Sequence, residues 1–361
     1  MTKKIAVYPP PGMTFESLFA KDCPWYAPGV ADRYEYLMRK QFSADGYELC
    51  SADSGDRPLD ASVVAIIHWS SINISLLKRY PDKIHIYYVF EPHINRPYNT
   101  KMGICQLSHL MDYSISLYEN VENPTRGIYS ISTIYNFEIN FSRADSNSPQ
   151  YLLATVSADK SALTKGELYS QRRAVIDWFE ENAPDEFRFW GAGWRERYQH
   201  FKTYGGQAEC KLTCLSQAKF ALCFENIRDQ TGYITEKLFD GMNSGAITVY
   251  WGAKNITDHI PADCFIDYRS LQTPEKLYQY LHSLSDNEIN SYRERIRNWL
   301  SSTSPEQFSY QRWVERTEMV IEQGKRAKPS ALHYVLYYIQ LYIPVVRNKL
   351  HRLLSGGKDR K

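Results

Sequence analysis

The chain has 361 residues, of which 43% are hydrophobic, and its 43 Lys and Arg residues nearly balance 41 Asp and Glu residues to give a formal net charge of +2. This composition excludes a disordered chain, a collagen-like repeat and a small disulfide scaffold. The length predicts two domains, because a single core rarely grows beyond roughly 250–300 residues. Residues 325–361 carry nine Lys and Arg residues and one acid, which leaves an acidic body of net charge −6.

The first apolar run of the chain is short. It covers Ile5–Tyr8 and ends at two prolines, whereas the core of a signal peptide needs about seven or more apolar residues. We therefore predict a first strand here and no export signal. The seven cysteines contain no CxxC pair, which predicts reduced thiols in the cytosol and no zinc site.

Apolar runs then alternate with helical patterns, and continuous apolar runs are typical of buried parallel strands. The predicted strands cover residues 5–8, 63–69, 84–90, 113–117, 151–157, 187–190, 220–224 and 246–251. The predicted helices cover about residues 33–42, 166–182, 236–244, 274–284, 287–301 and 305–324. With a polar linker at 141–150, this order predicts two doubly wound α/β domains, with the ligand crevice at the carboxyl ends of the strands.

The segment 220–261 carries the strongest chemical signal. It predicts a strand, a loop, a helix that begins after Thr235 and ends before Gly245, and a further strand. The N-terminus of such a helix offers free N–H groups to a pyrophosphate, and Lys237 adds a full positive charge. Glu236 suits a pair of ribose hydroxyls, because a carboxylate accepts two hydrogen bonds at once. The alternative is that both residues only cap a surface helix.

These residues also resemble a known family. Phe224-Glu225-Asn226, followed by Tyr233-Ile-Thr-Glu236-Lys237-Leu238, is similar to the signature of glycosyltransferase family 10, the α-1,3-fucosyltransferases. The similarity extends in order over about residues 150–270, through Phe189-Trp-Gly191-Ala-Gly193, Lys219-Phe-Ala-Leu, Thr248-Val-Tyr-Trp-Gly252, Asn255, Pro261 and Cys264-Phe-Ile-Asp267. The chain contains no competing P-loop, GxSxG elbow or complete GxGxxG motif after a strand.

The resemblance implies a GT-B fold, an α/β architecture in which two Rossmann-like domains face each other across a cleft. It assigns acceptor binding to residues 1–145 and GDP-fucose binding to residues 150–325. It also matches five residues to donor-site positions: Arg172 and Lys237 at the pyrophosphate, Glu236 at the ribose, and Asn226 and Tyr233 in the donor pocket. Arg173 is an alternative to Arg172, and a solvated helix charge is the alternative role for the arginine.

Glu91 is the candidate catalytic base. It ends the strongly apolar run 84–90, and a carboxylate at the carboxyl end of a buried strand is costly unless it faces a cleft. The resembling family places its proposed catalytic glutamate after a comparable strand. His93 is a rival base, because imidazole titrates near neutral pH. A strand-capping turn is the alternative for both residues.

The sequence predicts no metal ligands and no tightly bound cofactor. It contains no Asp-x-Asp pair, so the resemblance leaves the phosphate charge to Lys237, an arginine and helix dipoles. Stimulation by Mn²⁺ or Mg²⁺ stays open.

The basic tail, residues 326–361, has an aromatic and apolar run at Leu332–Val346 between basic clusters. The run is shorter than the roughly 20 residues that span a bilayer, and its pattern favours an interfacial helix attracted to anionic lipid. A helix packed on the protein itself and a nucleic-acid patch are the alternatives. Because the body is acidic, we expect no nucleic-acid partner and a cytoplasmic protein on the inner face of a bacterial inner membrane.

The expected function is therefore transfer of fucose from GDP-fucose, with inversion at the anomeric carbon. The expected acceptor is an N-acetylglucosamine-containing glycan such as a lipopolysaccharide O-antigen, in α-1,3 or α-1,4 linkage. The chain shows no N-terminal anchor pattern, so the resemblance is to the bacterial branch of the family. A transferase of another GDP-sugar, and a non-catalytic glycan-binding or membrane-associated protein on the same fold, are the alternatives.

Overall fold

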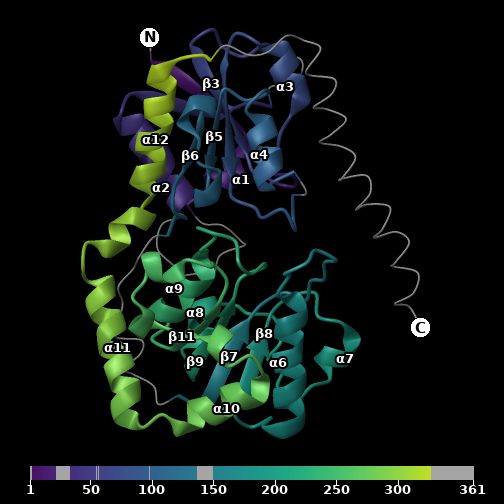
Figure 1. Ribbon diagram of the computed structural model, residues 1–361. Coiled ribbons are helices and arrows are strands. Elements are labelled where there is room, and N and C mark those ends of the chain that lie inside the picture. Colours follow the sequence, from purple (N-terminus) through teal and green to yellow (C-terminus); the bar gives the residue numbers. More distant parts are fainter. Residues whose placement is uncertain are drawn as a thin grey trace. The chain divides into compact units, whose positions relative to one another are not determined.

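The computed structural model describes residues 2–21, 33–53, 55, 57–96, 98–135 and 149–326. These residues belong to two compact units (Figure 1). Unit 1 combines Met1–Ala20, Glu35–Ile131 and Tyr310–Lys361, and unit 2 combines Lys21–Tyr34 and Ser132–Ser309. Most of the predicted linker and all of the predicted tail except Arg326 lie outside the described residues.

Unit 1 is built on a six-stranded sheet in which all neighbouring strands are parallel, in the order β2-β1-β3-β4-β5-β6. Its strands are β1 Lys3–Tyr8, β2 Tyr47–Ser51, β3 Val63–Trp69, β4 Ile84–Val89, β5 Tyr113–Ser116 and β6 Ile128–Ser130. Every residue of β4 and β5 is buried, as expected for central strands of a parallel sheet covered on both faces.

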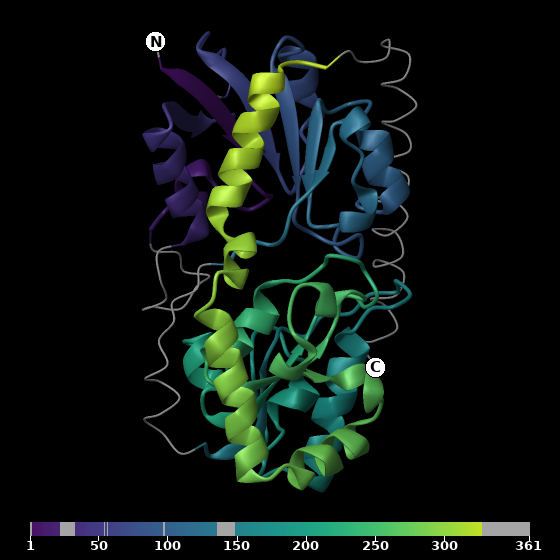
Figure 2. The same ribbon diagram turned by 60° about the vertical axis from the view of Figure 1, so that its left-hand side comes forward.

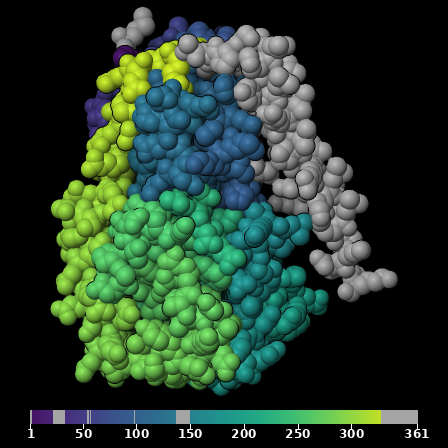
Figure 3. Space-filling model, viewed as in Figure 1, coloured from purple at the N-terminus to yellow at the C-terminus, as the bar shows by residue number. Residues whose placement is uncertain are grey.

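The described helices of unit 1 are α1 Phe15–Leu18, α2 Tyr34–Ala44, α3 Ile74–Arg79, α4 Lys101–Leu107 and α12 Tyr310–Gln323, with 3₁₀ turns at Glu119–Val121 and Pro124–Arg126. Helix α12 lies across the sheet of this unit (Figure 2). Its outer face is exposed at the surface, in yellow in Figure 3. The C-terminal part of the described chain therefore completes the N-terminal unit.

Aromatic packing explains where α12 lies. Trp313 is fully buried and stacks on Phe90 with a ring-centroid distance of 4.3 Å. The Thr317 hydroxyl contacts the buried Tyr88 hydroxyl at 2.5 Å. We expected one helix over residues 305–324 at the end of the second domain. Instead, a 3₁₀ turn at Ser304–Phe308 precedes α12, and the helix packs in unit 1, because its buried side chains find their partners on β4.

Unit 2 contains a five-stranded parallel sheet in the order β11-β10-β9-β7-β8. Its strands are β7 Tyr151–Val156, β8 Phe187–Trp190, β9 Ala218–Phe224, β10 Ile247–Trp251 and β11 Ile266–Asp267. Its helices are α6 Tyr169–Asn182, α7 Glu196–Gln199, α8 Lys211–Leu215, α9 Glu236–Asn243, α10 Pro274–Ser283 and α11 Asp286–Leu300, with 3₁₀ turns at Ile256–Asp258, Ala262–Cys264, Tyr268–Ser270 and Ser304–Phe308. Loops that follow the parallel strands therefore meet at one edge of this sheet.

All of the predicted strands are present, with ends that differ by at most two residues. The sequence patterns missed β2, β6 and β11 and the short helices α1, α3, α4, α7 and α8. Helices of four to seven residues contain too few positions to show a period. Within the described residues, no helix combines the length and apolar character needed to cross a membrane.

We expect Glu318 on α12 to weaken unit 1 as the pH rises. Burial, with the nearby Asp45 carboxylate, raises the pKa of Glu318 to about 7, and its buried Oε1 has no hydrogen-bond partner in the described structure. In the unfolded chain the same group ionises near a pKa of about 4.3. The contribution of Glu318 to the free energy of unfolding is therefore most favourable below about pH 4, and it is lost as the pH rises through the folded pKa.

Glu318→Gln should remove this loss, so the variant should be more stable than the parent protein at pH 8 and show a flatter profile between pH 4 and 8 in urea denaturation. The gain should be modest, because solvent screens a partly exposed carboxyl. Equal pH profiles for the two proteins would contradict the assignment.

Candidate functional site in unit 2

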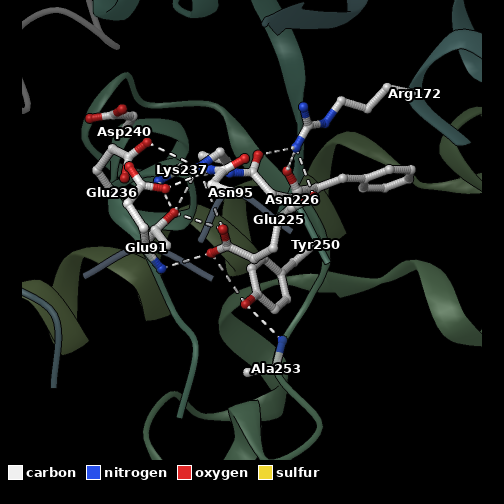
Figure 4. A network of polar contacts seen from close by, with 12 residues as sticks. Glu91, Asn95, Arg172, Glu225, Asn226, Glu236, Lys237, Asp240, Tyr250 and Ala253 are labelled. Carbon is white, nitrogen blue, oxygen red and sulfur yellow. Dashed lines mark hydrogen bonds and ion pairs between the residues drawn. The ribbon is translucent and has the colours of Figure 1, made fainter. Parts of the chain in front are cut away.

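A buried carboxylate, Glu225, organises the loop between β9 and α9 (Figure 4). It follows β9 at the carboxyl edge of the sheet. Its two oxygens accept hydrogen bonds of 2.7 Å each from the Thr235 backbone N–H and the Thr235 hydroxyl. Because Thr235 is the N-cap of α9, Glu225 fixes the position at which that helix begins.

Glycine at position 252 makes room for this carboxylate. A Cβ atom on Gly252 would lie 2.3 Å from Glu225 Cγ, which is far inside van der Waals contact. Burial raises the pKa of Glu225 above its ordinary value, although Lys237 acts in the opposite direction. The carboxylate therefore depends on its local partners to remain ionised.

Lys237 and Glu236 begin α9, as the sequence predicts, and belong to the same network (Figure 4). Lys237 Nζ donates to Thr235 Oγ1 at 3.0 Å and to Glu236 Oε1 at 3.1 Å, and it lies 3.5 Å from Glu225 Oε2. Burial disfavours the charged amine, but the two carboxylates outweigh it and raise the pKa of Lys237. Burial likewise opposes ionisation of Glu236, yet Lys237 and Lys211 lower the pKa of Glu236 to about 2. The Lys237 amine and the Glu236 carboxylate are therefore charged at neutral pH.

Lys211 is a second lysine of this network that the sequence analysis did not identify. It begins α8 and forms a close ion pair with Asp240 of α9. The Tyr135 hydroxyl donates to the other Asp240 oxygen at 2.8 Å. Lys211 and Asp240 are 29 residues apart, and a lone lysine before a short helix carries no local pattern that could have revealed the pair.

Helix α6 brings Arg172 to the end of β9. Its Nη2 donates to the backbone carbonyls of Phe224 and Glu225 at 2.6 and 2.7 Å, and to Asn226 Oδ1 at 3.2 Å. Arg172 is 5% exposed, and burial lowers the pKa of its guanidinium below the usual value. The structure thus joins Arg172 and Asn226, which the sequence assigned to one donor site, and links them through Glu225 to the start of α9.

Arg173, the alternative to Arg172, does not contact Asn226 or the end of β9 in the described structure and forms an ion pair elsewhere. Its Nη1 lies 3.0 Å from Asp159 Oδ1 in the loop after β7. Tyr233 is 2% exposed and lies close enough to Arg172 to affect the pKa of that guanidinium. The turn before Tyr233 is anchored by Asn255, whose Oδ1 accepts a 2.9 Å hydrogen bond from the backbone N–H of residue 232.

Glu91 belongs to unit 1, where it follows β4 at the carboxyl edge of that sheet. Its Oε2 accepts a hydrogen bond of 2.6 Å from Asn95 Nδ2, and its backbone carbonyl accepts one of 2.7 Å from the fully buried Asn99. These contacts fix the turn that carries the carboxylate. Burial lowers the pKa of His93, so its imidazole is neutral at pH 7. Glu91 and His93 both stay candidates for the base.

The unit 2 network contains equal numbers of basic and acidic side chains. The three cations Arg172, Lys211 and Lys237 are matched by three carboxylates, Glu225, Glu236 and Asp240. Within the part of the chain that the structure describes, no three His, Cys, Asp or Glu side chains are grouped so that they could hold a metal ion. The chemistry available here is that of fixed cations, carboxylates and the N–H groups of a helix end.

Comparison with known proteins finds a family match that includes the network around Glu225 and α9. Residues 171–326 match the family model described as glycosyltransferase family 10 (fucosyltransferase), C-terminal. An α-(1,4)-fucosyltransferase of Arabidopsis thaliana is 35% identical over 75 residues, which is 21% of this chain and 18% of that protein. The α-(1,3)-fucosyltransferase FucT of Helicobacter pylori is 30% identical over 110 residues, which is 30% of this chain and 23% of that protein. The matches thus span less than a quarter of these two relatives.

The fold comparison covers more of the chain. A crystal structure of an α1,3-fucosyltransferase with GDP aligns with a TM-score of 0.53 over 89% of this chain and 90% of that chain, at 15% identity. With two parallel α/β sheets, the protein has the GT-B fold, as the sequence predicted. Residues 171–326, a little under half of the chain, are therefore similar to the C-terminal domain of glycosyltransferase family 10.

Glu225→Ala should destabilise unit 2 strongly. The change leaves the Thr235 N–H without its acceptor and removes a buried partner of Lys237, and breaking a buried ion pair from one side costs about 3–5 kcal/mol. Urea denaturation measures the loss. The matched control is Glu315→Ala, which removes an exposed pair with Arg312 and should cost about 0–1 kcal/mol. Similar losses for the two variants would show that Glu225 does not organise the loop.

Proposed function

We propose that the protein transfers L-fucose from GDP-fucose to a glycan hydroxyl, with inversion at the anomeric carbon. The observation that carries the proposal is the cluster at the start of α9, where Lys237, Glu236 and the helix N-terminus meet the network of Arg172 and Asn226. The match of residues 171–326 to a fucosyltransferase family model, and the similarity to two fucosyltransferases, support fucose as the sugar. The family match lies mainly in unit 2, which supports unit 2 as the donor-binding part.

Departure of GDP requires positive charge at the phosphates. When the bond between the fucose anomeric carbon and the phosphate oxygen breaks, the electron pair stays on GDP, and Lys237 and the α9 N–H groups stabilise it. Within the described structure the hydrogen bonds of Arg172 use Nη2, so Nη1 and Nε keep donors for a phosphate. Glu236, whose side chain is 46% exposed, accepts the ribose hydroxyls.

The attacking hydroxyl needs a base, and we assign this role to Glu91. The carboxylate takes the hydroxyl proton while the acceptor oxygen forms its bond to the anomeric carbon on the face opposite GDP, which inverts the configuration. Asn95 holds Oε2, which leaves Oε1 for the proton. A base placed in this way belongs to the acceptor side of the reaction and has no part in binding the nucleotide.

The acceptor glycan and the role of divalent ions complete the proposed reaction. An N-acetylglucosamine-containing glycan, such as a lipopolysaccharide O-antigen of a bacterium, is the proposed acceptor, and the matched relatives are named for both α-1,3 and α-1,4 linkages. Because Lys237, Arg172 and a helix end provide the positive charge, Mn²⁺ or Mg²⁺ is assigned only a stimulating role. Loss of all transfer in EDTA, restored by either ion, would contradict that role.

The donor assignment predicts selective nucleotide binding. Calorimetry should show that the protein binds GDP and GDP-fucose and does not bind UDP. Lys237→Ala should weaken GDP binding by about ten-fold or more, because one charge-assisted contact to phosphate is worth about 1.5–3 kcal/mol. Lys202→Ala, which removes an exposed lysine paired with Asp185, is the matched control and should bind GDP normally. Absence of guanine-nucleotide binding would overturn the proposed function.

The base assignment predicts a loss of turnover without a loss of nucleotide affinity. Glu91→Gln keeps the size of the side chain but cannot accept the proton, so kcat should fall by about 10²–10⁴-fold while GDP affinity stays unchanged. His93→Gln should keep most of the activity. The reverse result, with His93→Gln inactive and Glu91→Gln active, would transfer the role of base to His93.

We also propose that the basic tail holds the enzyme at the inner face of the cytoplasmic membrane. The support is its sequence alone, an aromatic and apolar run between basic clusters, and these residues lie outside the described part of the chain. Deletion of residues 329–361 should abolish sedimentation with vesicles that contain phosphatidylglycerol, while the full chain should sediment less with phosphatidylcholine alone. A truncated protein that still binds anionic vesicles would exclude the tail as the membrane contact.

A further inference from the structure

Unit 2 contains a recess that the proposed roles do not use. It has a volume of about 290 Å³ and is lined by residues 162–168 of the loop after β7, together with Gln171, Arg228 and Trp251. Sites for drug-sized ligands span about 300–1,000 Å³, so this recess suits a single ring better than a whole nucleotide sugar. Its size is the first indication of the class of ligand.

The walls of the recess are fixed by backbone hydrogen bonds between the loops that form it. The Arg228 N–H donates to the carbonyl of residue 166 at 2.9 Å, and the Leu168 N–H donates to the Asn226 carbonyl at 3.1 Å. On the other side, the Glu225 N–H donates to the Trp251 carbonyl at 2.8 Å. The recess is therefore a formed feature of the carboxyl edge of the sheet, and it shares a wall with the Arg172 and Asn226 site.

The lining combines apolar surface with hydrogen-bonding groups. The half-buried Trp251 indole and the Leu163 side chain, which is 77% exposed, supply the apolar part. The Arg228 guanidinium lies 5.5 Å from the Trp251 ring centroid, over the indole. Three further polar side chains, those of Thr164, Lys165 and Gln171, line the recess and make no hydrogen bonds within the described structure.

This combination fits a sugar ring. A pyranose has C–H groups that pack on aromatic and aliphatic side chains and a rim of hydroxyls that pair with amide, hydroxyl and guanidinium groups. We propose that this recess binds one pyranose ring beside the donor site.

The inference rests on the proposed function, which supplies two sources for such a ring: the fucosyl group of the donor and a sugar of the acceptor glycan. Binding and kinetic measurements on one set of variants separate them. The test variants are Arg228→Ala and Leu163→Asp, both of exposed side chains, so folding should be preserved. The matched control is Arg197→Ala, because Arg197 is an exposed arginine that lies 5.3 Å from the Tyr198 ring centroid outside the recess.

Calorimetry with GDP and GDP-fucose, and kinetics with N-acetyllactosamine as acceptor, give the readouts. If the ring belongs to the acceptor, both test variants should raise KM for N-acetyllactosamine on the order of ten-fold and leave both nucleotide affinities unchanged. If it is the fucosyl group, GDP-fucose affinity should fall by a similar factor while GDP affinity stays constant. Either result supports the inference, provided that Arg197→Ala behaves as the parent protein.

Two outcomes would overturn the inference while leaving the proposed function intact. One is unchanged binding and kinetics in both test variants. The other is an equal loss of GDP and GDP-fucose affinity, which would make the recess a nucleotide site. A parent protein that binds neither nucleotide overturns the proposed function itself, and the pyranose assignment with it.

Discussion

The hydrogen bonds from Thr235 to the buried Glu225 are the contacts on which the unit 2 network depends. A fully buried carboxylate is costly, and here it is stabilised by two 2.7 Å hydrogen bonds from one residue and by the Lys237 ammonium 3.5 Å away. Those partners are the N-cap and second residue of α9. The same contact therefore satisfies a buried charge and sets the start of the helix. The neighbouring glycine at position 252 is required for steric reasons.

Much of this region could be predicted from local sequence, because its information is local. Thr235, Glu236 and Lys237 are consecutive, and an N-cap followed by two charges predicts their positions whatever surrounds them. The strands could be predicted for the same reason, because a continuous apolar run indicates a buried parallel strand without information from other segments. The role of Glu225 as an anchor did not follow, although it lies within the family signature, because its partners come from a loop ten residues further along the chain.

The placement of α12 and the partner of Lys211 could not be predicted, because both depend on contacts between distant segments. Helix α12 shows a buried stripe that would suit either sheet, and the Trp313 stack on Phe90, more than 200 residues earlier in the chain, places it in unit 1. Lys211 was not identified for the same reason, because its structural role depends on its ion pair with Asp240 in another segment. Periodicity and capping describe a segment, whereas these features belong to pairs of segments.

The balance of charges in unit 2 bears on how an anion could bind. Lys237 is already paired with Glu236 and Glu225, so a diphosphate must compete for an ammonium that has partners. Glu236 is partly exposed and can be solvated when that pair opens. Glu225 is buried and cannot be solvated in this way, but both of its oxygens keep their hydrogen bonds from Thr235 if the Lys237 ammonium moves away. The Thr235 bonds thus allow Lys237 to change partners while the start of α9 stays fixed, which a carboxylate paired with the lysine alone could not achieve.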